Sequence, residues 1–100
     1  MLAEFSISPI GSGESLSREV AKAFEIIHAS GVRYEHHAMG TNLEGDWDAV
    51  IGVIKACRDR LRADHRRLAI SIRIDDRAGV DDGLHSKLSS TRSKLATGRR

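Results

Sequence analysis

The polar side chains best suited to recognising a small ligand lie in one short stretch, residues 39–48, which reads "MGTNLEGDWD". Thr41, Asn42 and Glu44 supply a hydroxyl, an amide and a carboxylate there. A partly enclosed carboxylate accepts charge-assisted hydrogen bonds worth about 1.5–3 kcal/mol each, which favours a ligand with an amino group or a positive charge. We therefore predict that this stretch reads the edge of a small heterocycle, while a capping or surface role for Glu44 stays open.

Two residues from other segments complete the predicted site. Ser8 lies in an alternating segment over 2–10, and Asp75 ends another over 68–75, "LAISIRID". Both belong to the polar half of their alternation, so we expect them on the same face of a sheet. Trp47 could add a stacking or cation–π surface worth roughly 0.5–2 kcal/mol, but it opens an apolar helical stripe, and we predict that it lies in the core.

The sequence shows no catalytic signature. It holds no G-x-S-x-G motif and no P-loop, and the lone Cys57 falls on an apolar helical stripe, where we predict a core position. His36 and His37 are adjacent, so on a strand they point to opposite faces, and the other histidines lack metal-ligand spacing. We therefore predict a protein that is not an enzyme and has no catalytic residues, no metal site and no cofactor.

The composition indicates a single soluble domain. One hundred residues can form one core, and 40% apolar with 30% charged residues is ordinary for a globular chain. A single cysteine permits no intramolecular disulfide, which fits a reducing compartment. The first residues, "MLAEFSISPI", lack the basic segment of a signal peptide, and no apolar run is long enough to span a bilayer. We expect a cytoplasmic protein with no membrane partner.

Basic residues concentrate in the C-terminal half, although the net charge is only +2. Residues 1–57 contain four Lys or Arg and eight Asp or Glu, out of 16 and 14 in the whole chain. A clustered basic face could bind nucleic acid, but such an excess is more often a solvated surface. Base stacking on a sheet also needs aromatic residues on the open face, where we expect serines, so nucleic-acid binding is the weakest alternative.

Hydrophobic periodicity predicts four strands and two helices. The alternating segments 2–10 and 68–75 form the first and last strands, and the shorter segments 32–39 and 40–45 form the second and third. Apolar residues recur at helical spacing between the first two strands and again after the third. Either Gly45 or Asp46 could cap the second helix.

This β-α-β-β-α-β order predicts an α+β fold. Two helices cover one face of a four-stranded antiparallel sheet, and right-handed crossovers give the ferredoxin-like sandwich with strand order 4-1-3-2. Residues 1–80 would form this domain. Leu84, Leu88 and Leu95 suggest a short C-terminal helix within 81–100, a segment with a basic tail that either belongs to the domain or packs on a partner subunit.

The two faces of the predicted sheet differ in character. The first face meets the helices with Phe5, Ile7, Ile70 and Ile72. The second face is polar and carries Glu4, Ser6, Ser8, Ser71, Arg73 and Asp75. We expect a cross-strand charge pair between Glu4 and Arg73, worth only about 0.2–1 kcal/mol. This open face is either solvated or packed against another subunit's sheet, with a polar pocket left at its edge.

Three segments together resemble the YkoF-like thiamine-binding protein family. They are "AEFSISPIG" at 3–11, "YEHHAMGTNLEGDWD" at 34–48 and "SIRIDDR" at 71–77. The match to the family's G-T-x-x-E-G and I-D-D-R motifs falls on Gly40, Thr41, Glu44 and Gly45, and on Ile74, Asp75, Asp76 and Arg77. Asn42 departs from the apolar or β-branched residue expected at its position.

The resemblance implies a ferredoxin-like fold that associates through its sheets into homodimers or dimers of dimers, that is, homotetramers. It also implies binding of thiamine or its hydroxymethylpyrimidine part without catalysis. We therefore expect a binding protein for transport, salvage or buffering, with Ser8, Thr41, Asn42, Glu44 and Asp75 at the ligand. The alternative is an oligomeric structural or regulatory module that binds no small ligand.

Overall fold

The computed structural model describes residues 1–11 and 16–78 of the chain. Six elements follow one another: β1 (Leu2–Pro9), α1 (Leu16–Ser30), β2 (Arg33–His37), β3 (Gly40–Glu44), α2 (Trp47–Arg62) and β4 (Leu68–Asp75). The strands form one four-stranded sheet in the order β2-β3-β1-β4. The predicted α+β ferredoxin-like sandwich and its strand order are therefore confirmed, whereas the predicted C-terminal helix and the segment 81–100 lie outside the described residues.

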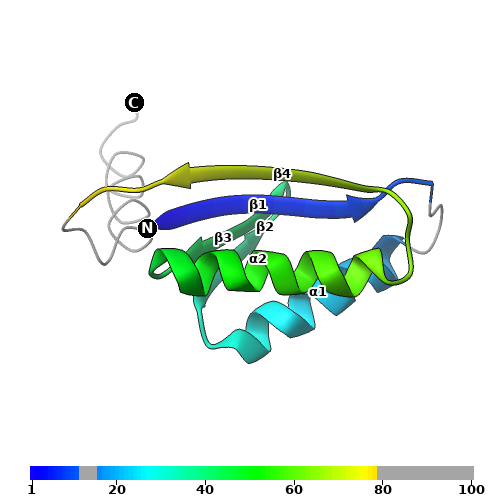
Figure 1. Cartoon of the computed structure of the whole chain (residues 1–100), viewed down its shortest axis with the longest axis horizontal. Coiled ribbons are helices and arrows are strands. Elements are labelled where there is room, and N and C mark those ends of the chain that lie inside the picture. The colour runs from blue at the N-terminus through cyan, green and yellow to red at the C-terminus, as the bar shows by residue number, and fades with distance from the viewer. Residues whose placement is uncertain (12–15, 79–100) are drawn as a thin grey trace.

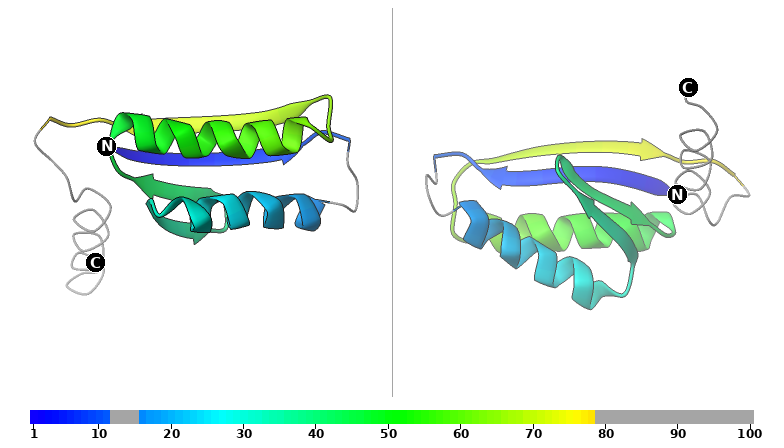
Figure 2. Two further views of the ribbon diagram at one scale, coloured as in Figure 1. Left: turned by 60° about the horizontal axis from the view of Figure 1, so that its bottom comes forward. Right: turned by 180° about the vertical axis from the view of Figure 1, so that it is seen from behind.

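Both helices lie on one face of the sheet (Figures 1 and 2). β1 runs through the middle, antiparallel to both β3 and β4, and β2 pairs with β3 at the far edge. Phe5 is paired with Thr41 on one side and with Ile72 on the other. Since paired residues point to the same face, Phe5, Thr41 and Ile72 all face the helices.

The core lies between the sheet and the two helices. Its central members are Ala3 and Phe5 of β1, Leu43 of β3, Ala23 and Ile27 of α1, and Val50, Val53, Ile54 and Cys57 of α2, each exposed by no more than 6%. The i, i+3, i+4, i+7 spacing of the helical members explains why each helix buries one stripe. Cys57 is fully buried, as predicted, and burial raises the pKa of its thiol to about 11.

The helix ends follow local rules. The carboxylate of Asp46 accepts a hydrogen bond from the backbone N–H of Ala49 at 2.8 Å and caps α2. α1 stops where Gly31 takes a positive φ of 79°. Of the two residues predicted to cap this helix, Gly45 and Asp46, it is Asp46 that does so.

Trp47 does not lie in the core, so that prediction is wrong. The side chain is 52% exposed, although Val50, three residues later, is fully buried. Helical side chains lean toward the N-terminus, so the first residue of α2 directs its ring beyond the start of the helix and away from the layer that covers Val50.

Ile70 and Ile72 depart from expectation in a different way. Their register partners, Ile7 and Phe5, show that they do lie on the helix-facing side. Nevertheless they are 41% and 46% exposed. β4 is an edge strand, so its side chains have a neighbouring strand on one side only.

Candidate functional site

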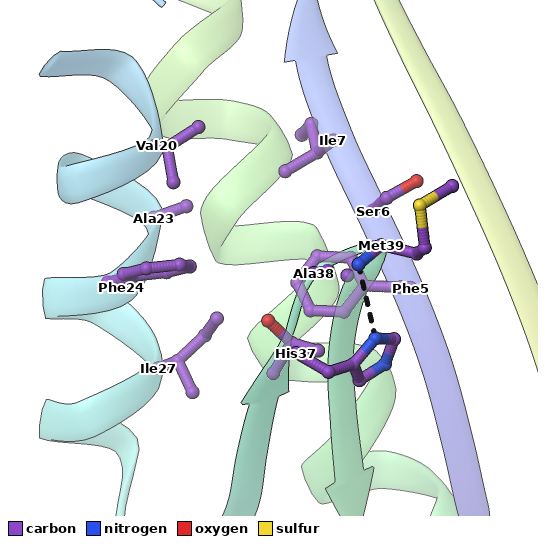
Figure 3. A pocket seen from close by; sticks show the side chains of 12 residues that line it. Phe5, Ser6, Ile7, Val20, Ala23, Phe24, Ile27, His37, Ala38 and Met39 are labelled. Atoms are coloured by element: carbon purple, nitrogen blue, oxygen red, sulfur yellow. Dashed lines mark hydrogen bonds between the residues drawn. The ribbon is translucent and has the colours of Figure 1, made fainter. Parts of the chain in front are cut away.

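A half-open pocket of about 240 Å³ lies between α1, β1 and the turn that joins β2 to β3 (Figure 3). Twelve residues line it: Phe5, Ser6, Ile7, Val20, Ala23, Phe24, Ile27, His37, Ala38, Met39, Gly40 and Thr41. Ligand pockets for drug-sized molecules usually span about 300–1,000 Å³, so this space suits a single ring or a small two-ring molecule.

The helical wall of the pocket is the apolar stripe of α1. Val20, Ala23, Phe24 and Ile27 face β1 across the gap (Figure 3). Ala23 is only 3% exposed, yet its side chain is a single methyl group. The space opposite Phe5 therefore stays open where a larger side chain would fill it.

The opposite wall is the turn between β2 and β3, and Gly40 allows it to approach β1. A Cβ atom at Gly40 would lie 2.6 Å from the carbonyl oxygen of Phe5. Any other residue would therefore push the turn away from the strand. Met39, at the rim, is 81% exposed, and its backbone N–H donates to Nδ1 of His37 at 3.3 Å (Figure 3).

Thr41, a residue only 3% exposed, contributes a hydroxyl group to the pocket. Its Oγ1 shares a hydrogen bond of 2.8 Å with Nδ1 of His36, and the tautomer of the ring decides which of the two donates. The ring of His36 in turn stacks on Phe24, with centroids 3.7 Å apart and planes at 22°. Thr41, His36 and Phe24 thus form a connected unit that joins the hydroxyl to the aromatic wall.

His36 is held in its neutral form near pH 7. Burial, followed by the positive charge that His37 can carry, lowers the pKa of His36 below its ordinary value of 6.5. Because its imidazole is neutral, His36 places no positive charge beside a ligand that contacts Thr41.

Acidification below pH 6.5 is expected to destabilise the protein through His36. Because the folded-state pKa is lowered, the unfolded chain takes up this proton at a higher pH than the folded chain does, so stability falls as the pH drops through that interval. Denaturant unfolding above and below pH 6.5 should show a smaller loss in His36→Gln than in the parent. An equal loss in both proteins would contradict the assignment to His36.

The other predicted site residues lie elsewhere. Asn42 and Glu44 are the register partners of Glu4 and Leu2, so their side chains lie on the open face, opposite the pocket. Asp75 also pairs with Leu2, from the other side. Two inter-strand spacings therefore separate the backbones of Glu44 and Asp75, about 10 Å.

Ser8 shares the open face but lies at the other end of β1, paired with Ala69. It lies six positions after Leu2, which corresponds to about 20 Å along a strand. The structure thus brings Asn42, Glu44 and Asp75 toward one end of the open face, leaves Ser8 at the other end, and places Thr41 alone in the pocket.

The carboxylate of Glu44 is used within the chain. It lies 2.8 Å from Nη1 of Arg33, and its side chain is only 2% exposed. It does not cap α2, since Asp46 does so. On the same face, Nε2 of His37 lies 3.3 Å from Glu4 and 3.2 Å from Oδ1 of Asn42. Arg73 is the register partner of Glu4, as expected, while the carboxylate of Glu4 lies 3.3 Å from Nε2 of His37.

Two residues of the pocket region, Phe24 and His36, carry only weak signals in the sequence. Phe24 fits the helical core stripe by its spacing, yet it is 39% exposed because it lines an open space. Nothing in the sequence distinguishes His36 from a histidine that is exposed or hydrogen-bonded within the chain. Its contact with Phe24 depends on how α1 packs on β2. No cluster of three metal-binding side chains occurs among residues 1–11 and 16–78.

Comparisons with known proteins match almost the whole chain. The sequence profile described as "Thiamine-binding protein" matches residues 3–92. The UPF0045 protein MJ1052 from Methanocaldococcus jannaschii is 36% identical over 90 residues, which cover 90% of each chain. A UPF0045 protein from Methanothermobacter thermautotrophicus is 38% identical over 96 residues, covering 93% of this chain and 97% of the relative.

Solved structures agree with the fold. The crystal structure of MJ1052 superposes with a TM-score of 0.82 at 35% identity, covering 91% of this chain and 94% of that one. The protein TM0486 from Thermotoga maritima, whose name proposes a role in thiamine biosynthesis or salvage, gives a TM-score of 0.80 over 91% of this chain and 97% of that one. Its identity is 23%, so this second likeness shows the fold alone.

Proposed function

Because this chain belongs to the thiamine-binding protein family, we propose that it binds thiamine or its hydroxymethylpyrimidine part and does not catalyse a reaction on it. The proposed role is transport, salvage or buffering of this ligand, with no further cofactor. The observation that carries the proposal is the pocket of about 240 Å³ with Thr41 at its polar end.

The pocket chemistry suits a flat aminopyrimidine. The apolar groups of Phe5, Val20 and Phe24 would enclose the faces of the ring. The hydroxyl of Thr41 would read its edge, where a hydrogen bond to a polar ring substituent adds orientation more than affinity. The half-open mouth beside Met39 would leave room for a second ring outside.

The charge of thiamine fits the same arrangement. Its thiazolium ring carries a permanent positive charge, which is costly to place beside another cation. His36, which shares a hydrogen bond with Thr41, has a lowered pKa and is neutral near pH 7. His36 therefore does not oppose the cation, and His37, which also lines the pocket, lies 3.3 Å from the carboxylate of Glu4.

The open face is the second candidate location for the same ligand. Asn42, Glu44 and Asp75, with Ser8 at greater distance, would contact it there, and the acidic groups would attract a positive charge. The pairing of Glu44 with Arg33 weakens this alternative, since that carboxylate is already neutralised.

Calorimetry with thiamine and with hydroxymethylpyrimidine distinguishes the two locations. Thr41→Val keeps the shape of the side chain and removes the hydroxyl, so it is expected to weaken binding about tenfold, as loss of one buried hydrogen bond does. Glu44→Gln is the matched control on the opposite face and should bind as the parent does.

The reverse result, with Glu44→Gln impaired and Thr41→Val unchanged, would place the ligand on the open face. Absence of heat with either ligand at millimolar concentration would overturn the proposed function. Circular dichroism of each variant shows whether a loss of binding reflects a loss of folding.

Self-association is also part of the proposal, as a homodimer or homotetramer. The support is the family resemblance together with Ile70 and Ile72, two apolar side chains exposed on the same strand. Self-association without any ligand would correspond to the alternative function, an assembly module. Within the part of the chain that is described, no helix is long and apolar enough to cross a membrane, and we propose that the protein acts in the cytoplasm.

A further inference from the structure

The hydrogen bond between Thr41 and His36 can form in two ways. It joins Oγ1 of Thr41 to Nδ1 of His36 at 2.8 Å. A threonine hydroxyl carries one proton and two lone pairs, and a neutral imidazole carries one N–H and one bare nitrogen. Either the hydroxyl donates its proton to a bare Nδ1, or a protonated Nδ1 donates to the hydroxyl oxygen. The two arrangements differ in what the hydroxyl presents to the pocket.

The burial of Thr41 decides between the two arrangements. The residue is only 3% exposed, and within residues 1–11 and 16–78 its hydroxyl has no hydrogen-bond partner besides His36. If Nδ1 donated, the hydroxyl proton would be left without an acceptor on the chain, and a buried donor without an acceptor is costly. If the hydroxyl donates, only lone pairs are left over, and acceptors tolerate this better than donors do. The geometry therefore favours a bare Nδ1 that accepts the proton of Thr41.

The other nitrogen of His36 is compatible with this assignment. A neutral imidazole with a bare Nδ1 carries its proton on Nε2. Nε2 of His36 is not among the buried polar atoms of the described chain that lack a partner, and the residue is half-buried, so water can accept this proton. The lowered pKa of His36 also keeps the ring neutral near pH 7, as the assignment requires.

Two aromatic neighbours hold the ring of His36 in place. Phe24 stacks on it with centroids 3.7 Å apart, and Tyr34 lies beside it at 5.0 Å with the planes at 46°. The hydroxyl of Tyr34 is itself held, since it shares a hydrogen bond of 2.8 Å with Nδ1 of His28 on α1. A ring packed in this way keeps Nδ1 directed at Thr41. The orientation of the Thr41 hydroxyl is therefore set before a ligand arrives.

We propose that His36 determines the ligand specificity of the pocket: its Nδ1 holds the Thr41 proton, so Thr41 offers only lone pairs and selects rings that donate an N–H. This inference rests on the proposed function and specifies which edge of a pyrimidine the pocket takes. An amino substituent supplies the donor, whereas a ring with only bare nitrogens would place lone pairs against lone pairs. His36 does not line the pocket, so it is a positioning residue that acts through Thr41.

A pair of matched ligands tests this selection. Hydroxymethylpyrimidine and the analogue in which a methyl group replaces its amino group have nearly the same shape and the same ring nitrogens. Only the first carries the amino N–H donor. Calorimetry with the parent protein should show hydroxymethylpyrimidine bound at least about tenfold more tightly, because the analogue leaves the lone pairs of Thr41 without a donor.

His36→Phe separates this role from a structural one. The new ring can still stack on Phe24 but has no nitrogen, so the hydroxyl of Thr41 is free to turn its proton into the pocket. The methyl analogue should then bind about tenfold more tightly than it binds the parent, because the hydroxyl can donate to a ring nitrogen. A loss of packing alone would weaken both ligands. Thr41→Val is the matched control, and without a hydroxyl it should bind the two ligands alike.

Nitrogen NMR of the histidine rings locates the proton without any ligand. The chemical shift of a ring nitrogen differs strongly between its bare and its protonated form. The chain has five histidines, and the signals of His36 are the ones missing from His36→Phe. At a pH well above 6.5, the ordinary histidine pKa, His36 should show a bare Nδ1 and a protonated Nε2. A protonated Nδ1 would overturn the proposal.

The results distinguish this proposal from the proposed function. A bare Nδ1, selective binding by the parent and the gain for the analogue in His36→Phe support it. If thiamine binds but the parent does not distinguish the two pyrimidines, or if a folded His36→Phe weakens both, the role of His36 is overturned and the proposed function stands. If His36→Phe does not fold, the selectivity of the parent and a comparison of Thr41→Val with it decide. If neither thiamine nor hydroxymethylpyrimidine binds at millimolar concentration, the proposed function is overturned and the selection with it.

Discussion

Replacing Leu43 with alanine is expected to lower the free energy of unfolding by about 2–5 kcal/mol. Leu43 is fully buried in β3, between its register partners Ala3 and Tyr34. The substitution removes apolar contacts and leaves a cavity between the sheet and the helices. The free energy of unfolding of a small domain is about 5–15 kcal/mol in total, so this one substitution removes a large part of it. Urea denaturation followed by circular dichroism measures it.

Asn42→Ala is the matched control for Leu43→Ala. It lies on the same strand one residue earlier, on the open face, where its amide contacts the ring of His37 at 3.2 Å. Its loss should cost about 1 kcal/mol or less. Comparable destabilisation by both variants would mean that the two faces of β3 contribute alike, contrary to the observed burial.

The strands and helices could be predicted because the periodicity of apolar residues within a segment indicates its secondary structure. Alternation over 68–75 and the helical stripe over 50–61 each define the side that faces the core without reference to the rest of the chain. The order of the six elements then leaves few topologies. What alternation cannot show is the lateral extent of the helical layer, which is why Ile70 and Ile72 lie on the expected face and are nevertheless exposed.

The candidate site was harder to predict because adjacent strand residues face opposite ways. Thr41 and Asn42 follow one another on β3, so one enters the pocket and the other lies on the open face. Assigning both residues to one site because they are adjacent in sequence therefore combines residues from opposite faces of the sheet. Side chains alternate between the two faces along a strand, and the sequence alone is enough to show this alternation. It places Thr41 on one face of the sheet and Asn42 and Glu44 on the other.

The pocket itself depends on distant packing that no local pattern contains. Its volume exists because the methyl group of Ala23 faces Phe5 and because Gly40 lets the β2–β3 turn approach β1. The stack of Phe24 on His36 likewise joins α1 to β2. These contacts between elements are set by the assembled fold, and a single sequence does not reveal them.

Filling the pocket with Val20→Phe is expected to weaken binding of thiamine and hydroxymethylpyrimidine at least about a hundredfold, because the ring would occupy the space that the ligand needs. Val20 is half-buried on α1 and faces Ile7 across the gap (Figure 3). The open mouth of the pocket gives the new ring room, so the cost in stability should stay within the roughly 1–3 kcal/mol of ordinary overpacking. Calorimetry and thermal unfolding on the same preparation separate the two effects.

Ala21→Phe is the control for this variant, since it introduces the same ring one residue along α1, at an exposed position that does not line the pocket. It should bind as the parent does. If Val20→Phe folds and still binds both ligands normally, the helix-facing pocket is not the site. The open face with Asn42, Glu44 and Asp75 would then be the next location to test, and the Arg33–Glu44 ion pair would have to open to receive the ligand there. One substitution on α1 therefore decides whether this pocket recognises the ligand.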